Sequence, residues 1–297
     1  MIELCLLGCG GVMPLPERAL TSLFVSYNGK ALLIDCGEGT QTVLKKHKLK
    51  YNRIDAILLT HLHGDHICGI AGLLLTFGLA ERDRPFKIYG PKGTANMLNA
   101  IETIAPGLPF EVICEELSEE SFELSEIGLK INSFPVKHST PCLGYRFELE
   151  RMPKFDVNKA QSLGIPVSFW GALQRGENAF GFEPRDVMGE NRKGITFLYS
   201  TDTRPVEAIT HYGKDSDLMI LEGMYGESEA EEKAEETSHM TMCEAAEMAK
   251  QANTKALWLT HYSPSVSNPS EYEAVVKSIF PNTTFGYDGL LQKLNFD

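Results

Sequence analysis

The residues best suited to chemistry lie in one short segment, Thr-His-Leu-His-Gly-Asp-His at positions 60–66. It holds three of the chain's eight histidines, His61, His63 and His66, together with Asp65. Imidazole nitrogens and carboxylate oxygens are ligands of Zn²⁺, Mn²⁺ and iron. Along a regular helix or strand these side chains would diverge, whereas a tight loop lets them converge. The spacing therefore predicts a metal-binding loop between a buried strand and a helix.

Three further candidate ligands each follow an apolar run. His138 follows INSFPVK, Asp202 follows ITFLYST and His261 follows ALWLT. Open α/β architectures place their ligands at the carboxyl ends of strands. Taken alone, each residue is also compatible with a cap or turn. Together with the 60–66 loop they indicate one constellation of strand ends, and the echo between AILLTH (56–61) and ALWLTH (256–261) suggests two sheets that face a shared site.

The positioning elements are short apolar strands that alternate with helical patterns. Helices are expected near 41–48, 69–79, 94–102, 238–252 and 269–280, with Ser238 or Thr241 as the cap of the fourth. The stretch from about 150 to 193 differs, because it holds three prolines, several glycines and no long buried strand. Its seven basic and six acidic residues give a net charge of +1. The rest of the chain therefore carries −13, which makes the total −12. We interpret it as a projecting arm inserted in a large domain.

Composition narrows the class of protein. Hydrophobic residues make up 43% of the 297, and no apolar run approaches the roughly 20 residues that span a bilayer. The seven cysteines are odd in number and never form a Cys-x-x-Cys pair, which argues against a disulfide framework and a thiolate zinc site. A cytoplasmic enzyme without a membrane partner is expected. The net charge of −12 disfavours a nucleic-acid substrate unless basic residues are concentrated in one place.

The histidine and aspartate pattern resembles the ligand set of the metallo-β-lactamase fold. The segments GCGGVMPLPERALTS, LLIDCGEGTQ, LLTHLHGDHICGIAGLLLTFGL and IYGPKG resemble the ribonuclease Z family, as do PVKHSTPCLGYRFE, STDTRP and HMT further along. This resemblance runs along nearly the whole chain. It implies an α/β (α+β) fold, a four-layer αββα sandwich, formed by a single domain over 1–297 with an inserted tRNA-binding arm at 150–193.

The resemblance also implies roles for individual residues. One metal would be held by His61, His63 and His138 and a second by Asp65, His66 and His261, with Asp202 as the bridge. The expected ions are two Zn²⁺, with Mn²⁺ or iron as alternatives. Asp65 would also act as general base, His239 would contact the scissile phosphate or leaving oxygen, and Glu222 would hold the other nitrogen of that imidazole.

The function implied is a zinc-dependent endoribonuclease that removes the 3′ trailer of pre-tRNA and leaves a 3′-hydroxyl. The family works as a homodimer in which one subunit's arm serves the other's site. A small-molecule phosphodiesterase, for example one acting on cyclic nucleotides, is the alternative, and it would need the metals but no arm. A catalytically silent metal-binding scaffold is a third possibility, against which the presence of His239 argues.

Several residues keep two interpretations. Arg204 either reaches a phosphate or belongs to a turn, and Phe169 and Trp170 either stack on nucleotides or pack the arm's own core. His47 and His211 are expected to be solvated. The acidic run at 226–237 is expected to be a solvated loop or helix face.

Overall fold

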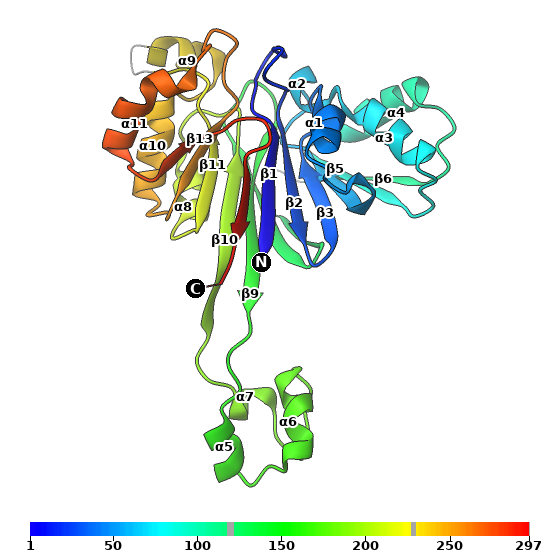
Figure 1. Ribbon diagram of the computed structural model, residues 1–297, viewed down its shortest axis with the longest axis vertical. Helices are drawn as coiled ribbons and strands as arrows, with labels where there is room; N and C mark the ends of the chain where they lie inside the picture. The colour runs from blue at the N-terminus through cyan, green and yellow to red at the C-terminus, as the bar shows by residue number, and fades with distance from the viewer. Residues whose placement is uncertain (118–121, 227–229, 297) are drawn as a thin grey trace. The chain divides into compact units, whose positions relative to one another are not determined.

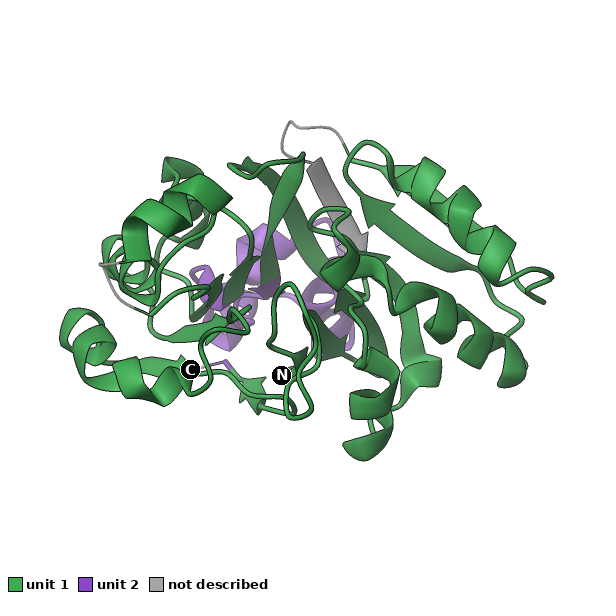
Figure 2. Ribbon diagram, turned by 90° about the horizontal axis from the view of Figure 1, so that it is seen from above, with its two compact units in different colours: residues 1–148, 196–295 green, residues 149–195, 296–297 purple. Residues whose placement is uncertain are grey.

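The computed structural model describes residues 1–117, 122–226 and 230–296. The chain divides into two compact units, distinguished by colour in Figure 2. The first unit comprises Met1–Glu148 and Thr196–Asn295, and the second comprises Leu149–Ile195 with Phe296.

A mixed sheet forms one half of the first unit. Its order is β14-β1-β2-β3-β4-β5-β6, with the first four strands antiparallel and β3 to β6 parallel. The β2–β3 hairpin turns through Asn28 and Gly29, both with positive φ (49° and 82°), as a tight two-residue turn requires. The strands are β1 (Ile2–Gly8), β2 (Ser22–Tyr27), β3 (Lys30–Ile34), β4 (Ile54–Leu58), β5 (Phe86–Gly90), β6 (Val112–Glu116) and β14 (Leu291–Leu294).

A second mixed sheet has the order β13-β12-β11-β10-β9-β8-β7. Strands β10 to β13 are parallel, whereas β7, β8 and β9 pair antiparallel. The strands are β7 (Phe122–Glu126), β8 (Leu129–Val136), β9 (Cys142–Arg151), β10 (Arg192–Ser200), β11 (Leu218–Glu222), β12 (Leu257–Thr260) and β13 (Thr283–Phe285).

Helices cover the outer face of each sheet, as Figure 1 shows for the first unit. Helices α1 (Thr40–Lys46), α3 (Ile70–Leu79) and α4 (Thr94–Ile104) share a core with the first sheet, and α8 (Glu207–Gly213), α10 (Met242–Gln251) and α11 (Glu273–Ile279) lie on the second. In β1, Cys5 and Leu7 point into the helix-covered core, while Leu4 and Leu6 are equally buried on the opposite face. The two sheets face each other there, and the αββα expectation is confirmed.

Direct contacts join the two sheets near the ends of their strands. The Tyr145 hydroxyl on β9 donates to the carbonyl of Leu59 just after β4 at 2.5 Å, and the Leu143 N–H donates to the Thr60 carbonyl at 2.9 Å. These bonds hold the second sheet against the segment that opens the 60–66 loop. The loop itself contains the short helix α2 (Gly64–Ile67).

The structure places the caps of the later helices. α10 begins at Met242 with Thr241 as its cap, because the Thr241 hydroxyl accepts the Glu244 N–H at 3.1 Å and the Glu244 carboxylate accepts the Thr241 N–H at 2.8 Å. Ser238 instead ends α9 (Glu231–Thr237) in a left-handed conformation, with φ of 60°. The last expected helix divides into a 3-10 turn, η3 (Pro269–Tyr272), and α11.

The second unit is a small helical body with its own core. It contains α5 (Val157–Ser162), α6 (Val167–Gln174) and α7 (Pro184–Val187), packed around Ala160, Ile165, Leu173 and Val187. Trp170 joins that core and its indole N–H donates to the Ile165 carbonyl at 2.9 Å. Phe169 is 37% exposed and stacks on Phe180. Of the two interpretations, the structure therefore supports core packing for Trp170 and leaves Phe169 at the surface.

Other expectations concern the surface and the thiols. His47 and His211 are exposed, as expected. Of the acidic run, residues 227–229 lie outside the described part, and 231–237 form α9. None of the seven cysteines, all of them in the described ranges, forms a disulfide, and five are buried. No helix in the described ranges is long and apolar enough to cross a membrane.

Candidate metal centre

The structure brings all the candidate site residues to one edge of the paired sheets. Five of them come from a strand end or from the segment just after it. His61 follows β4, His138 follows β8, Asp202 follows β10, Glu222 ends β11 and His261 follows β12. His63, Asp65 and His66 come from the loop that contains α2, and His239 lies between α9 and α10.

Two of these residues adopt an unusual backbone conformation. Asp202 and His261 have φ of 51° and 55°, in the left-handed region. Aspartate and histidine tolerate this region better than most residues, and it turns the chain sharply at the strand end. Both side chains are thereby buried, at 2% and 0% exposure, with their polar atoms facing the other ligands.

The donor atoms fall into three groups: two share Asp202, and a third consists of Glu222, His239 and His261. The first group is His61, His63, His138 and Asp202. In it, His63 Nδ1 lies 3.3 Å from His138 Nε2, and His61 Nε2 lies 3.6 Å from Asp202 Oδ2.

The second group is Asp65, His66, Asp202 and His261. His66 Nε2 lies 3.2 Å from His261 Nε2, and the Oδ1 of Asp202 lies 3.2 Å and 3.1 Å from these two nitrogens. Asp65 Oδ2 lies 3.3 Å from His261 Nε2. Asp202 thus presents one carboxylate oxygen to each group, which is the arrangement of a bridging ligand.

These groups fit divalent cations. Ligands about 2.0–2.1 Å from a tetrahedral metal lie roughly 3.3 Å from one another, which matches the nitrogen–nitrogen distances. Among the described residues, His61 Nε2 and Asp202 Oδ1 are buried without a hydrogen-bond partner. A buried polar atom without a partner is costly, and a cation would satisfy both.

The charges of the site also favour a bound cation. Burial opposes ionisation of Asp202, but His261, His66 and His61 hold the pKa of its carboxyl well below the usual range. Burial likewise opposes ionisation of Asp65, yet a hydrogen bond from His261 and the nearby imidazoles lower its pKa. Burial lowers the pKa of His261, but Asp202, Asp65 and Glu222 raise it overall to about 10. The carboxylates therefore favour positive charge at this position.

Asp35 contacts the site and is a residue that sequence reasoning did not single out. It directly follows β3, has φ of 58° and is fully buried. Its Oδ1 accepts the Thr60 N–H at 2.8 Å, and its Oδ2 lies 2.9 Å from both the Thr60 hydroxyl and His66 Nδ1. This contact keeps the proton of His66 on Nδ1 and leaves Nε2 free for a metal. The signal was available, because Asp35 also follows an apolar strand.

His239 lies outside the two groups that share Asp202 and belongs to the third, with Glu222 and His261. Its Nδ1 lies 2.8 Å from Glu222 Oε2, and the other oxygen of Glu222 accepts the Thr203 N–H at 2.6 Å. Burial lowers the pKa of His239, but the Glu222 carboxylate more than offsets this and the pKa is raised. The imidazolium form is therefore favoured, with Nδ1 held by Glu222.

Arg204 does not present its guanidinium to the ligand groups. The guanidinium donates to both carboxylate oxygens of Glu244 and to the His239 carbonyl, and the Arg204 N–H donates to the Lys137 carbonyl at 2.9 Å. Of the two interpretations, the structure favours a structural one. Arg204 ties together the segments that carry Asp202, His138 and His239.

A loop at the amino-terminal end of the chain completes the rim. The Val12 N–H donates to Asp65 Oδ2 at 2.7 Å, although Val12 is β-branched and has φ of 67°. Gly11 lies so close to the His261 ring that a Cβ there would be 2.6 Å from its Cε1. Asp288 holds both ends of the loop: it accepts the Cys9 N–H at 3.2 Å and the Ala19 N–H at 2.6 Å.

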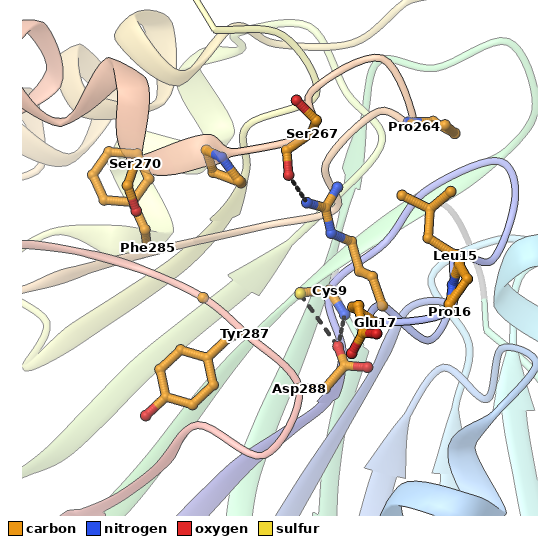
Figure 3. Close-up of a pocket in the computed structure, with 13 residues that line it drawn as sticks. Cys9, Leu15, Pro16, Glu17, Pro264, Ser267, Ser270, Phe285, Tyr287 and Asp288 are labelled. Atoms are coloured by element: carbon orange, nitrogen blue, oxygen red, sulfur yellow. Dashed lines mark hydrogen bonds between the residues drawn. The ribbon is translucent and has the colours of Figure 1, made fainter.

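Figure 3 shows the contact between Asp288 and Cys9, two of the residues that line a cavity of about 660 Å³. Arg18, on the same loop, donates to the carbonyls of Val266 and Ser267 at 3.1 and 3.3 Å. The loop is therefore fastened to the segment that follows His261, and the cavity lies between the two.

Comparison with known proteins places this centre in a family. Residues 2–151 match the family described as Anti-Pycsar protein Apyc1, and residues 155–262 match the beta-lactamase superfamily domain. The chain is 47% identical to ribonuclease Z of Lachnospira eligens, across 100% of this chain and 99% of that protein. It is also 47% identical to ribonuclease Z of Agathobacter rectalis over the same shares.

The chain belongs to the ribonuclease Z family. Human tRNase Z, short form, superposes with a TM-score of 0.73 at 25% identity and covers 99% of this chain and 100% of its own. The two sheets and their helices are thus those of the metallo-β-lactamase fold, as expected. In this ribonuclease Z family member, the clustered histidines and aspartates form a site for divalent metal.

Proposed function

We propose that the chain is a tRNA 3′-processing endoribonuclease that removes the 3′ trailer of pre-tRNA and leaves a 3′-hydroxyl. Relatives that are 41–47% identical over 99–100% of their own length carry the name ribonuclease Z. The single observation that carries the proposal is the pair of ligand groups joined by Asp202, beside an imidazole held by Glu222.

The proposal assigns two Zn²⁺ ions, with Mn²⁺ or iron as alternatives for the same ligands. His61, His63 and His138 would hold one ion, and Asp65, His66 and His261 the other, with Asp202 between them. When bound, such a pair supplies hydroxide at neutral pH and clamps the attacking and leaving oxygens of a phosphodiester.

The chain's own residues would then handle protons. Asp65 would accept the proton of the attacking water, and the Val12 N–H and His261 orient its carboxylate for this role. His239 as imidazolium would donate a proton from Nε2 to the departing 3′-oxygen, which becomes the 3′-hydroxyl. Glu222 orients that ring through Nδ1 and stabilises its charge.

Residues 150–193 would serve as the substrate-binding arm of a single-domain enzyme spanning 1–297. The exposed pair Phe169 and Phe180 offers aromatic faces for this role. The proposal includes a homodimer in which the arm of one subunit serves the other's site. It also includes the cytoplasm as the place of action, because bacterial pre-tRNA is made there.

The test is a side-by-side assay of metal-loaded protein on a pre-tRNA with a 3′ trailer and on bis-p-nitrophenyl phosphate. His61→Ala serves as the inactive control. Cleavage that leaves a 3′-hydroxyl at the end of the mature tRNA supports the proposal. Deletion of residues 155–178 is expected to abolish tRNA cleavage and to spare hydrolysis of the small ester.

A small-molecule phosphodiesterase is the second candidate. The net charge of −12 favours it, because a polyanionic protein repels a long polyanion more than a small one. Turnover of the small ester without any cleavage of pre-tRNA would move the chain to this class and keep the metal chemistry.

A further inference from the structure

One surface of the first unit is strongly basic although the chain as a whole is acidic. Residues 39–54 contain five lysines and arginines and no aspartate or glutamate. We call residues 45–53 the basic segment. It carries five positive charges, so the rest of the chain carries −12 − 5 = −17. All five of these side chains are exposed: Lys45, Lys46, Lys48, Lys50 and Arg53.

Acidic side chains of the described residues do not pair with these five positive charges. Within the described ranges, none of the five forms an ion pair, whereas the neighbouring Arg82 and Arg84 both pair with Asp55. Exposed like charges within nine consecutive residues repel one another, because they lie within or near the roughly 8 Å screening length of physiological salt. Such a cluster is stabilised by an anionic partner with several charges.

The helix that leads into the basic segment begins close to the metal loop. Helix α1 starts at Thr40, just after Cys36 and Gly37, which pack on that loop. The Cys36 N–H donates to the His66 carbonyl at 2.7 Å, and a Cβ on Gly37 would lie 2.3 Å from the Asp65 carbonyl oxygen. α1 has seven residues and is therefore about 10 Å long. The lysines at its far end thus lie about three nucleotides from the metal loop, at roughly 3.4 Å per nucleotide.

The shape of the surface indicates what it binds. Lys46 borders a groove of about 420 Å³ whose walls include Tyr287, 60% exposed, and the carboxylates of Glu17 and Glu38. Those carboxylates disfavour phosphate inside the groove, so an anion would lie on the α1 side. Exposed lysines without a buried pocket suit the repeated phosphates of a nucleic acid backbone better than one small anion.

We propose that the basic segment binds the phosphate backbone of the RNA substrate a few nucleotides from the scissile bond. The proposal rests on the function proposed above and explains how a chain of net charge −12 holds a polyanion. The attraction is local, because it arises from one segment, which α1 joins to the residues that pack on the metal loop.

The test compares two triple variants of equal net charge. The first is Lys45→Gln, Lys46→Gln and Lys50→Gln in the basic segment. The control is Lys30→Gln, Lys214→Gln and Lys250→Gln, which removes three exposed lysines elsewhere in the first unit. Both proteins are assayed on pre-tRNA at several salt concentrations and on bis-p-nitrophenyl phosphate.

Loss of three single-strand contacts lowers the slope of log affinity against log salt by about 2, since each contributes roughly 0.7. At 0.1 M salt the KM for pre-tRNA is expected to rise roughly 10- to 100-fold in the first variant only. Turnover of the small ester should stay unchanged in both, which also shows that the variants fold. Binding of a single-stranded RNA oligonucleotide to metal-free protein should weaken in parallel.

Equal KM values and equal RNA affinities in the two triple variants would overturn the role of the basic segment. If the unmodified protein still cleaves pre-tRNA, that outcome leaves the proposed function standing. Failure of the unmodified protein to cleave pre-tRNA would instead overturn the proposed function. If the basic-segment variant then also bound the RNA oligonucleotide as well as the unmodified protein does, this inference would be overturned too.

Discussion

Replacement of Asp35 by asparagine tests how the chain prepares a metal ligand. Asp35 Oδ2 lies 2.9 Å from His66 Nδ1, and its Oδ1 accepts the Thr60 N–H at 2.8 Å. A carboxylate accepts hydrogen bonds at both oxygens, whereas an amide accepts at one and donates at the other. The substitution preserves the shape and changes only this pattern.

Neither orientation of the introduced amide satisfies the site. If the amide nitrogen faces His66, its N–H meets the Nδ1–H of that ring, and neither group can accept a hydrogen bond. The conflict is relieved only if the His66 proton moves to Nε2, the atom that faces His261 and Asp202. With the amide nitrogen toward Thr60, it meets the backbone N–H and leaves a buried donor unsatisfied, at a cost of about 1–3 kcal/mol. Loss of an outer partner of a metal-bound histidine lowers metal affinity about 10- to 100-fold, which equals about 1.4–2.8 kcal/mol.

The assay is competition for Zn²⁺ between a chromophoric chelator and metal-free Asp35→Asn protein. We expect the site containing His66 to weaken by this factor and kcat on the small ester to fall with it. Asp217→Asn is a matched control, because Asp217 also accepts a backbone N–H, that of Thr196 at 2.8 Å, but it lies at the opposite end of β11 from Glu222. It should lose stability and keep its zinc affinity. Zinc affinity within threefold of the unmodified protein in Asp35→Asn would refute the tautomer argument.

Four further outcomes are expected. Asp202→Ala should lose both metals, because it removes the oxygen from each ligand group; two metals per chain by elemental analysis would contradict the bridge. His239→Ala should keep its metal and lose most of kcat, whereas a rise in KM alone would argue against proton donation. In metal-free protein, the Glu222 carboxylate raises the pKa of His239 above its ordinary value. The contact of protonated His239 with Glu222 therefore contributes fully to the free energy of unfolding below about pH 6.5. This contribution is lost as the pH rises through the raised pKa. Urea unfolding of unmodified and Glu222→Gln protein across pH 6–9 measures this, and identical slopes would count against it. Val12→Gly should raise the free energy of unfolding by up to about 1 kcal/mol, since it removes left-handed strain and keeps the N–H to Asp65; a drop in stability with lost activity would mean that the side chain matters.

Much of the site could be predicted from the sequence because its signal is local. Three histidines and an aspartate within six residues, and His or Asp directly after apolar runs, are patterns that neighbouring residues create. The same holds for the helix at Ile70–Leu79 and for the resemblance to ribonuclease Z. Asp35 obeys the same strand-end pattern and was overlooked because its partner, His66, lies 31 residues away.

Other features depend on contacts that no local pattern encodes. Arg204 follows Asp202 and could have faced a phosphate, but its guanidinium lies on Glu244, 40 residues later. Ser238 and Thr241 are equally good caps by residue type, and Thr241 caps α10 because Ser238 already ends α9. Trp170 turns inward because the Ile165 carbonyl and a small core are there to receive it.

Residue types and their spacing were enough to indicate a metal centre, its ligands and the strands that carry them. Which atom of each ligand faces which partner was decided only in three dimensions. Asp202 offers Oδ2 to His61 and Oδ1 to His261 because two strands from different sheets end at the same edge. That division follows from the packing of residues 141 and 59 positions from Asp202, since the directions of their side chains depend on how the two sheets meet.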